Sequence, residues 1–156
     1  MDVPLILVPD RDGKLDGELI VYIAGQARTK LPFVAGVRHG EMHVFDEQGH
    51  LAQTSQFVNG QQEGETVQYY GTGQVQETAT YRKNALHGET VKFYENGKVR
   101  ERAQYENGKL VGQPIPYDHK GKDQKTEMNL QKQVARLNKA TAAGMKTWNS
   151  LKGLFK

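Results

Sequence analysis

Apolar and polar residues alternate with a period of two along much of the chain. Val67-Gln68-Tyr69 and Val91-Lys92-Phe93 show this alternation, and Val99, Ala103 and Tyr105 extend it. Such alternation is typical of a β-strand with one buried face. Asn-Gly pairs follow several of these segments and would supply the positive φ angles of type I′ turns, at Asn59-Gly60, Asn96-Gly97 and Asn107-Gly108. The pattern therefore predicts a series of β-hairpins.

These hairpins belong to an internal repeat. A glycine recurs with spacings of 23, 24, 24 and 24 residues, at Gly17, Gly40, Gly64, Gly88 and Gly112. An aromatic residue follows five positions after each glycine, at Tyr22, Phe45, Tyr69, Phe93 and Tyr117. A second aromatic column runs through Phe33, Phe57, Tyr81 and Tyr105. We expect both columns to form the core on one face of a thin sheet and the opposite face to be polar.

The repeat predicts a mainly β fold, an elongated antiparallel β-meander of roughly ten strands built from tandem hairpins. We place this repeat domain at residues 1–122. Apolar residues make up 37% of the chain, which is too little for a thick two-layer α/β core but suits a thin, turn-rich sheet. A single sheet, however, has no second layer against which it can bury an apolar face.

The repeat unit resembles a known family. Its pattern, Gly-Glu-x-x-x-(Tyr/Phe)-x-x-x-Gly-x-x-x-x-x-x-x-(Tyr/Phe)-x-x-Gly, is clearest over Gly64 to Asn84 and Gly88 to Gly108. This unit is similar to the MORN repeat variant of bacterial YwqK-type antitoxin and immunity proteins, over about residues 13–122. The resemblance implies the hairpin fold, a role as an antitoxin or immunity protein, and no catalytic residue. It also implies kinship with MORN arrays that act as membrane-proximal scaffolds.

From Asp123 onward the period changes to that of a helix. A largely apolar stripe steps by three or four residues, at Leu130, Val134, Leu137, Thr141, Gly144/Met145, Trp148, Leu151 and Phe155. Asp123 follows the turn-forming Gly121, so we expect it to be the N-cap of the helix. Residues 123–156 are therefore predicted to be a basic amphipathic C-terminal helix.

Charge divides the chain at about the same point. Residues 1–117 carry 12 Lys/Arg and 15 Asp/Glu, a net charge of −3, whereas residues 118–156 carry 9 and 3, a net charge of +6. Such asymmetry indicates an interaction surface. Three destinations remain open for the helix: the apolar face of its own sheet, a protein partner such as a second copy in a homodimer, or an anionic membrane. The candidate contact residues are Trp148, Leu151, Phe155, Lys146 and Lys152.

The residues that could carry chemistry do not form a recognisable site. The chain has no cysteine, and His39 and His43 on one strand would lie about 13 Å apart, too far to share a metal. The glutamates Glu18, Glu41, Glu65 and Glu89 recur in every repeat, which favours a structural or solvated role. We therefore predict no enzyme activity, no metal and no cofactor. The tail lacks interleaved arginine and aromatic residues, so we expect no nucleic-acid partner.

A protein-binding surface is the remaining expectation. Tyr70 and Tyr94 follow core aromatics and should point to the polar face, beside Lys92, Arg100 and Arg102. The alternative is that the tyrosines only stabilise cross-strand packing. We predict a cytoplasmic protein, since the N-terminus lacks a basic signal-peptide region, that occludes a toxin or effector by steric contact. The rivals are a scaffold at the inner face of the membrane, anchored by its tail, and an effector or adaptor of a bacterial secretion system.

Overall fold

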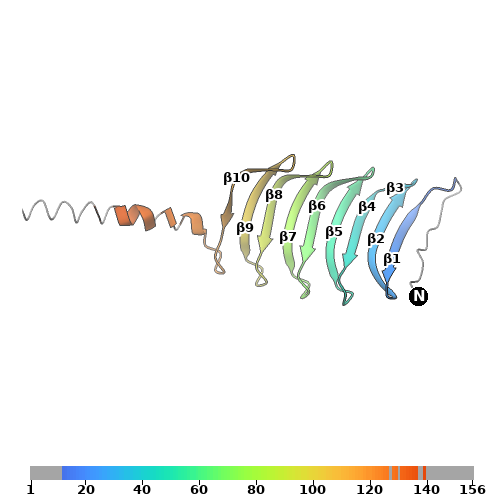
Figure 1. The fold of residues 1–156 in the computed structure, drawn as a ribbon, viewed down its shortest axis with the longest axis horizontal. Helices are drawn as coiled ribbons and strands as arrows, with labels where there is room; N and C mark the ends of the chain where they lie inside the picture. The colour runs from blue at the N-terminus through green and yellow to red at the C-terminus, as the bar shows by residue number, and fades with distance from the viewer. Residues whose placement is uncertain (1–11, 127, 130, 137–138, 140–156) are drawn as a thin grey trace, which may run out of the picture.

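The computed structural model describes residues 12–126, 128–129, 131–136 and 139, and its β part is one long antiparallel sheet (Figure 1). Strands that follow one another in sequence are neighbours in the sheet, in the order β1-β2-β4-β5-β6-β7-β8-β9-β10, with short β3 pairing with β2. The predicted meander is confirmed. Its strands are β1 (Gly17–Ile23), β2 (Gln26–Val34), β3 (Val37–Arg38), β4 (Gly40–Phe45), β5 (Leu51–Val58), β6 (Gln61–Tyr69), β7 (Val75–Arg82), β8 (Ala85–Phe93), β9 (Val99–Glu106) and β10 (Lys109–Pro116).

Two kinds of turn alternate between the two ends of the strands. At one end, consecutive strands are connected by turns of two residues that both have positive φ: Ala35-Gly36, Asn59-Gly60, Lys83-Asn84 and Asn107-Gly108. At the other end the first turn, Ala24-Gly25, is again of two residues with positive φ, but longer turns follow, in which Tyr70 N donates to Gln74 O and Tyr94 N donates to Lys98 O. The predicted turns at Asn59-Gly60 and Asn107-Gly108 are confirmed. The type I′ prediction at Asn96-Gly97 is wrong, because only Gly97 of that pair has a positive φ.

The repeat glycine has a conformational reason to recur. Gly64 and Gly88 have φ angles of +97° and +105°, which side chains other than glycine rarely adopt. Each lies opposite an aromatic residue on the next strand, in the pairs Gly64–Tyr81 and Gly88–Tyr105. The ring can cover the exposed glycine backbone, a known way of strengthening such strands. Gly17 and Gly40 repeat the arrangement opposite Phe33 and Phe57.

The two faces of the sheet differ in the residues they carry. One face, here called the hydroxyl face, has a central row of small residues paired across strands: Ser55, Thr66, Ala79, Thr90 and Ala103. The other, here called the glutamate face, bears Glu18, Glu41, Glu65 and Glu89, because successive side chains of a strand point to opposite faces.

The aromatic columns do not share one face, so the prediction of a single apolar face is wrong. Tyr81 pairs with Gly64 on the hydroxyl face, whereas Tyr69 lies five residues after Gly64 and therefore on the glutamate face. A bulge also shifts the phase of β7, since Tyr69 lies opposite Val75 but Gln68 opposite Glu77. Each face thus has its own aromatic column.

The hydroxyl face covers its own core. Ser55, Thr66, Ala79 and Thr90 are buried although no second layer lies over them in the described chain. Longer side chains reach across this row: Gln53 Nε2 donates to Ser55 Oγ at 2.9 Å and Gln62 Nε2 to Thr66 Oγ1 at 2.7 Å. Because the residues of the central row are small, longer side chains from neighbouring positions on the same face can cover them. A single sheet can bury a core in this way.

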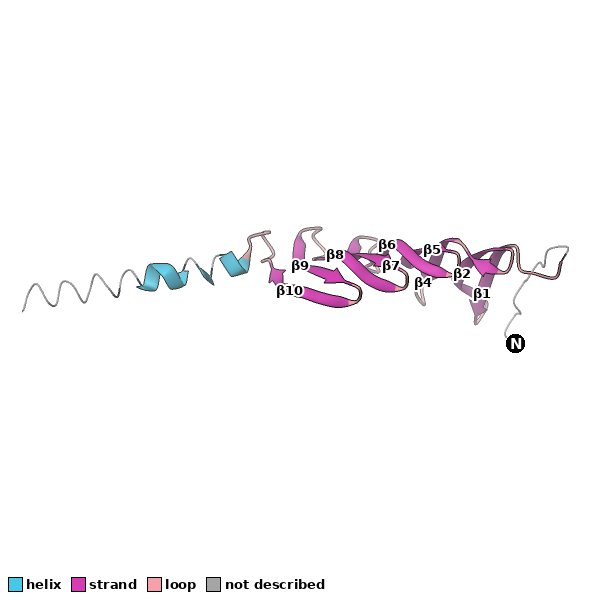
Figure 2. Ribbon diagram, turned by 90° about the horizontal axis from the view of Figure 1, so that it is seen from above, coloured by secondary structure: helices cyan, strands magenta, loops and turns pink. Residues whose placement is uncertain are grey.

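The C-terminal helix begins where the sequence predicts. Asp123 Oδ1 accepts hydrogen bonds from Lys125 N at 2.8 Å and Thr126 N at 3.1 Å, which confirms Asp123 as the N-cap. The described helical residues, 124–126, 128–129, 131–136 and 139, are exposed and lead away from β10 along the long axis of the sheet (Figure 2). They do not cover the sheet. Trp148, Leu151, Phe155, Lys146 and Lys152 lie outside the described residues.

The N-cap predicts a pH dependence of the helix. A side-chain hydrogen bond from Thr126, followed by backbone hydrogen bonds, holds the pKa of Asp123 below its ordinary value of 3.8. A lowered pKa means that the cap stabilises the helix above the ordinary value and that this contribution is lost as the pH falls through the folded-state pKa. An NMR titration should give a midpoint for Asp123 below 3.8. The amides of Lys125 and Thr126 should shift with the same midpoint, and a midpoint at or above the ordinary value would contradict the cap.

Candidate protein-binding surface

The surface predicted from Tyr70, Tyr94, Lys92, Arg100 and Arg102 does not assemble on one face. Lys92 lies opposite Glu101, and its Nζ is 3.0 Å from Glu101 Oε1 on the hydroxyl face. Arg102 lies opposite Val91, one residue along the same ladder, and so belongs to the glutamate face. The prediction of a shared face is therefore wrong, whereas a binding role for these residues individually stays a prediction.

The two tyrosines link one repeat to the next. Tyr70 and Tyr94 stand just after β6 and β8, and their hydroxyls donate to Phe93 O at 2.7 Å and Tyr117 O at 2.9 Å. The Tyr94 ring also lies 3.9 Å from the ring of His119, between centroids. Both hydroxyls are thus already engaged within the sheet, which favours the packing alternative over the role of interface anchors.

Histidine has a comparable structural role at the opposite end of the strands. At Glu63 and His39, the residue before the repeat glycine accepts a hydrogen bond from the turn of the next hairpin: Glu63 Oε2 accepts from Lys83 N at 2.8 Å, and His39 Nδ1 from Asn59 N at 3.5 Å. His87, before Gly88, does not repeat this bond, because its Nδ1 has no partner in the described chain. Within the described part of the chain, no group of three or more His, Asp or Glu could hold a metal ion. None of the described helices is long and apolar enough to cross a membrane.

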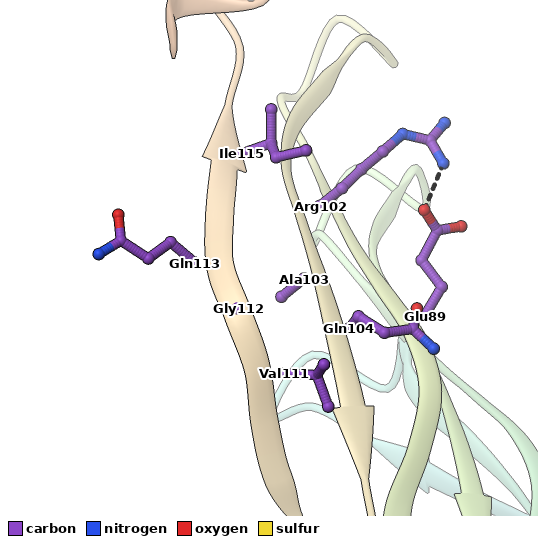
Figure 3. Close-up of a pocket in the computed structure, with 8 residues that line it drawn as sticks. All are labelled: Glu89, Arg102, Ala103, Gln104, Val111, Gly112, Gln113 and Ile115. Atoms are coloured by element: carbon purple, nitrogen blue, oxygen red, sulfur yellow. Dashed lines mark hydrogen bonds and ion pairs between the residues drawn. The ribbon is translucent and has the colours of Figure 1, made fainter.

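Arg102 forms one wall of a shallow hollow near the end of the sheet (Figure 3). Its Nη1 lies 2.7 Å from Glu89 Oε1, and this hydrogen bond raises the pKa of Arg102 above its ordinary value. The hollow has a volume of about 270 Å³ and is also lined by Ala103, Gln104, Val111, Gly112, Gln113 and Ile115. Arg100, on the same strand, is exposed, and its carbonyl accepts a hydrogen bond from Tyr117 N at 2.9 Å.

An offset in strand pairing creates this hollow. Val111 lies opposite Gln104 but Ile115 lies opposite Arg102, so β10 has two more residues than β9 in this interval. The extra residues around Gly112 leave the ladder open beside Ala103. Val111 is 48% exposed there, because β10 is the last strand of the described sheet.

The glutamate face forms a continuous surface beyond the hollow. Along β6, Glu65, Val67 and Tyr69 alternate onto this face, and β8 repeats the set one unit later. Their neighbours across the strands add more apolar side chains, namely Leu51, Val75 and Val99 opposite the aromatics Phe45, Tyr69 and Phe93. All of these apolar residues except Val91 are partly exposed. The result is an apolar and aromatic band bordered by a row of acidic residues.

The acidic row is only partly neutralised. His43 Nε2 lies 2.9 Å from Glu41 Oε1, and Arg102 pairs with Glu89. Among the described residues, Glu18 and Glu65 form no ion pair, and all four glutamates are exposed. The repeat pattern predicts that these glutamates recur but does not by itself predict the surface that they border. The spacing Glu-x-Val-x-Tyr, which places three residues on one face, was the signal that could have found it.

Comparison with known proteins supports the repeat. Residues 62–83 and 86–107 match the family model of the MORN repeat variant, and together they span β6 to β9. No curated protein matches the chain. Two adjacent MORN repeats indicate a repeat-based binding module, whereas the finer resemblance to YwqK-type antitoxins stays a prediction.

The tyrosine links can be tested by stability measurements. Removing the Tyr94 hydroxyl with Tyr94→Phe leaves Tyr117 O without its donor and should lower the free energy of unfolding by about 1 kcal/mol. Tyr81→Phe is the matched control, because the Tyr81 hydroxyl makes no hydrogen bond to another described residue. Urea denaturation should separate the two variants; equal stabilities would show that the Tyr94 hydroxyl does not couple the repeats.

Proposed function

We propose that this chain is a non-enzymatic protein-binding repeat module that neutralises a bacterial toxin by covering it with the glutamate face. The observation that carries the proposal is the band of partly exposed apolar and aromatic residues beside the row of glutamates. Solvent-exposed apolar bands rimmed by charge are typical of protein-interaction sites. This face also carries aromatic residues and Arg102, and aromatic residues and arginine are the residue types that most often contribute most of the binding energy.

The architecture suits a steric mechanism. Nine strands in sequence, each about 4.8 Å from the next, give a face about 38 Å long, enough for a standard interface of about 800 Å² per partner. The cross-strand ladder holds the side chains in place before binding, so little ordering is required when a partner docks. A rigid face of this kind can block a partner's active site without chemistry of its own. The complementary partner surface is apolar at its centre and basic along one side.

Two features support the proposed antitoxin role: the resemblance of the repeats to those of antitoxin proteins, and the glutamate face. The protein encoded beside this gene is the natural probe, because antitoxins and their toxins must be made together. If that protein is a toxin, co-expression of the chain should restore growth, and the purified pair should form a complex.

A variant at the centre of the glutamate face tests the docking surface. Thr78 lies between Val67 and Val91 on this face, so Thr78→Arg would place a bulky charge inside the apolar band. Its affinity for the toxin, measured by calorimetry, should fall at least tenfold, about 1.4 kcal/mol. The control Thr72→Arg changes an exposed turn residue and should bind as the wild type does. Equal affinities in both variants, with unchanged circular dichroism, would exclude the glutamate face as the docking surface.

A further inference from the structure

We propose that the C-terminal helix of one copy docks along the glutamate face of a second copy, and that the exchange is reciprocal in a two-fold dimer. The proposal shares the glutamate face with the proposed function but does not depend on it, and the tail of a second copy would compete with a toxin for that face. Here the occupant is specified: a basic amphipathic helix supplied by this same chain.

The helix has apolar side chains that its own sheet does not cover. Met128 and Val134 are 51% and 47% exposed, and every described helical residue is exposed. The helix is fixed at its start by the Asp123 cap and by the bridge between Tyr117 and Asp123, and it leads away from β10 (Figure 1). Met128 and Val134 can therefore be buried only against another surface.

Charge selects the acidic sheet of a second copy as that surface. Residues 118–156 have a net charge of +6, and no acidic residue follows Glu127. Two such helices repel each other, which disfavours pairing through the helices alone. Residues 1–117 have a net charge of −3, and the glutamate face presents Glu18 and Glu65 without ion pairs to other described residues. Opposite charges on the two surfaces favour their association.

Shape and length agree with this docking. The apolar band of the glutamate face runs across the strands, so a helix lying along it would follow the long axis of the sheet. The helix that the sequence predicts over residues 123–156 would be about 51 Å long at about 1.5 Å per residue, whereas the apolar band crosses the strands from β4 to β9 and is about 24 Å long. One helix is therefore long enough to cover the band from end to end.

The open strand edge at β10 is a poorer route to self-association. Tyr117 N donates to Arg100 O on β9, so the backbone nitrogens of Pro114 and Pro116 face the open edge by alternation. Proline has no N–H to donate to an added strand, and its presence on an edge is a known protection against edge pairing. Reciprocal helix exchange instead closes the assembly at two copies.

Two oppositely designed variants test the dimer. The sheet variant carries Glu18→Lys and Glu65→Lys, and the tail variant carries Lys132→Glu and Lys139→Glu, all at exposed positions. The control carries Glu47→Lys and Glu95→Lys in exposed turns. Sedimentation equilibrium of the full-length chain should show a dimer that weakens as salt rises. Each designed variant should dissociate at least tenfold more readily, and the control should match the wild type. Mixing the two variants should restore a dimer, because the unaltered basic tail of the sheet variant then meets the unaltered acidic sheet of the tail variant, and in the reciprocal contact the introduced acidic side chains face the introduced basic ones.

The opposing results are equally definite. Weak specific dimers form at about 100 µM, so a wild-type chain that stays monomeric at this concentration and low salt would overturn the proposal. A dimer whose dissociation constant is the same in both variants, or a mixture of the variants that does not form a dimer, would also overturn it. Binding of a monomeric chain to vesicles containing phosphatidylglycerol would assign the helix to membranes instead. Toxin binding by a monomeric chain would leave the proposed function standing, and a dimer without toxin binding would remove only that function.

Discussion

A sheet of one layer must find its stability between neighbouring strands, because nothing in the described chain lies over either face. The hydroxyl face meets this constraint with small residues such as Ser55 and Thr66, over which Gln53 and Gln62 close. Burial is therefore lateral, from row to row, and each repeat contacts only its neighbours. In such an array the stability is approximately a sum of repeat and interface contributions.

The different roles of the two faces follow from the same constraint. The hydroxyl face uses its long side chains for internal cover, and the turns at both ends add links between repeats through Tyr70, Tyr94 and Glu63. The glutamate face is not needed for these links. Its aromatics are supported from within the sheet yet remain partly exposed, which is the arrangement a preformed docking surface requires.

The sequence predicts the repeat and its turns better than it predicts the faces. A period of 24 residues is visible because Gly64 and Gly88 need positive φ, and Asp123 is recognisable as a cap from its local context. Which residues share a face depends on pairing register. One extra residue at Gln76 shifts the phase of β7, and Lys92 and Arg102 fall on opposite faces because of a register that no local pattern shows. The direction in which the helix leaves the sheet likewise depends on tertiary geometry.

Pro114 and Pro116 disfavour the addition of a further strand at the β10 edge of the sheet. In the C-terminal half of β10, Pro114 and Pro116 offer no outward N–H to an added strand, so this part of the edge is a poor template for fibre formation. Internal units are different, since each meets nearly identical neighbours on both sides. Gene duplication could therefore lengthen the array by inserting a hairpin between existing ones, and every such insertion would extend the sheet by two strands while keeping β10 and the helix that follows it.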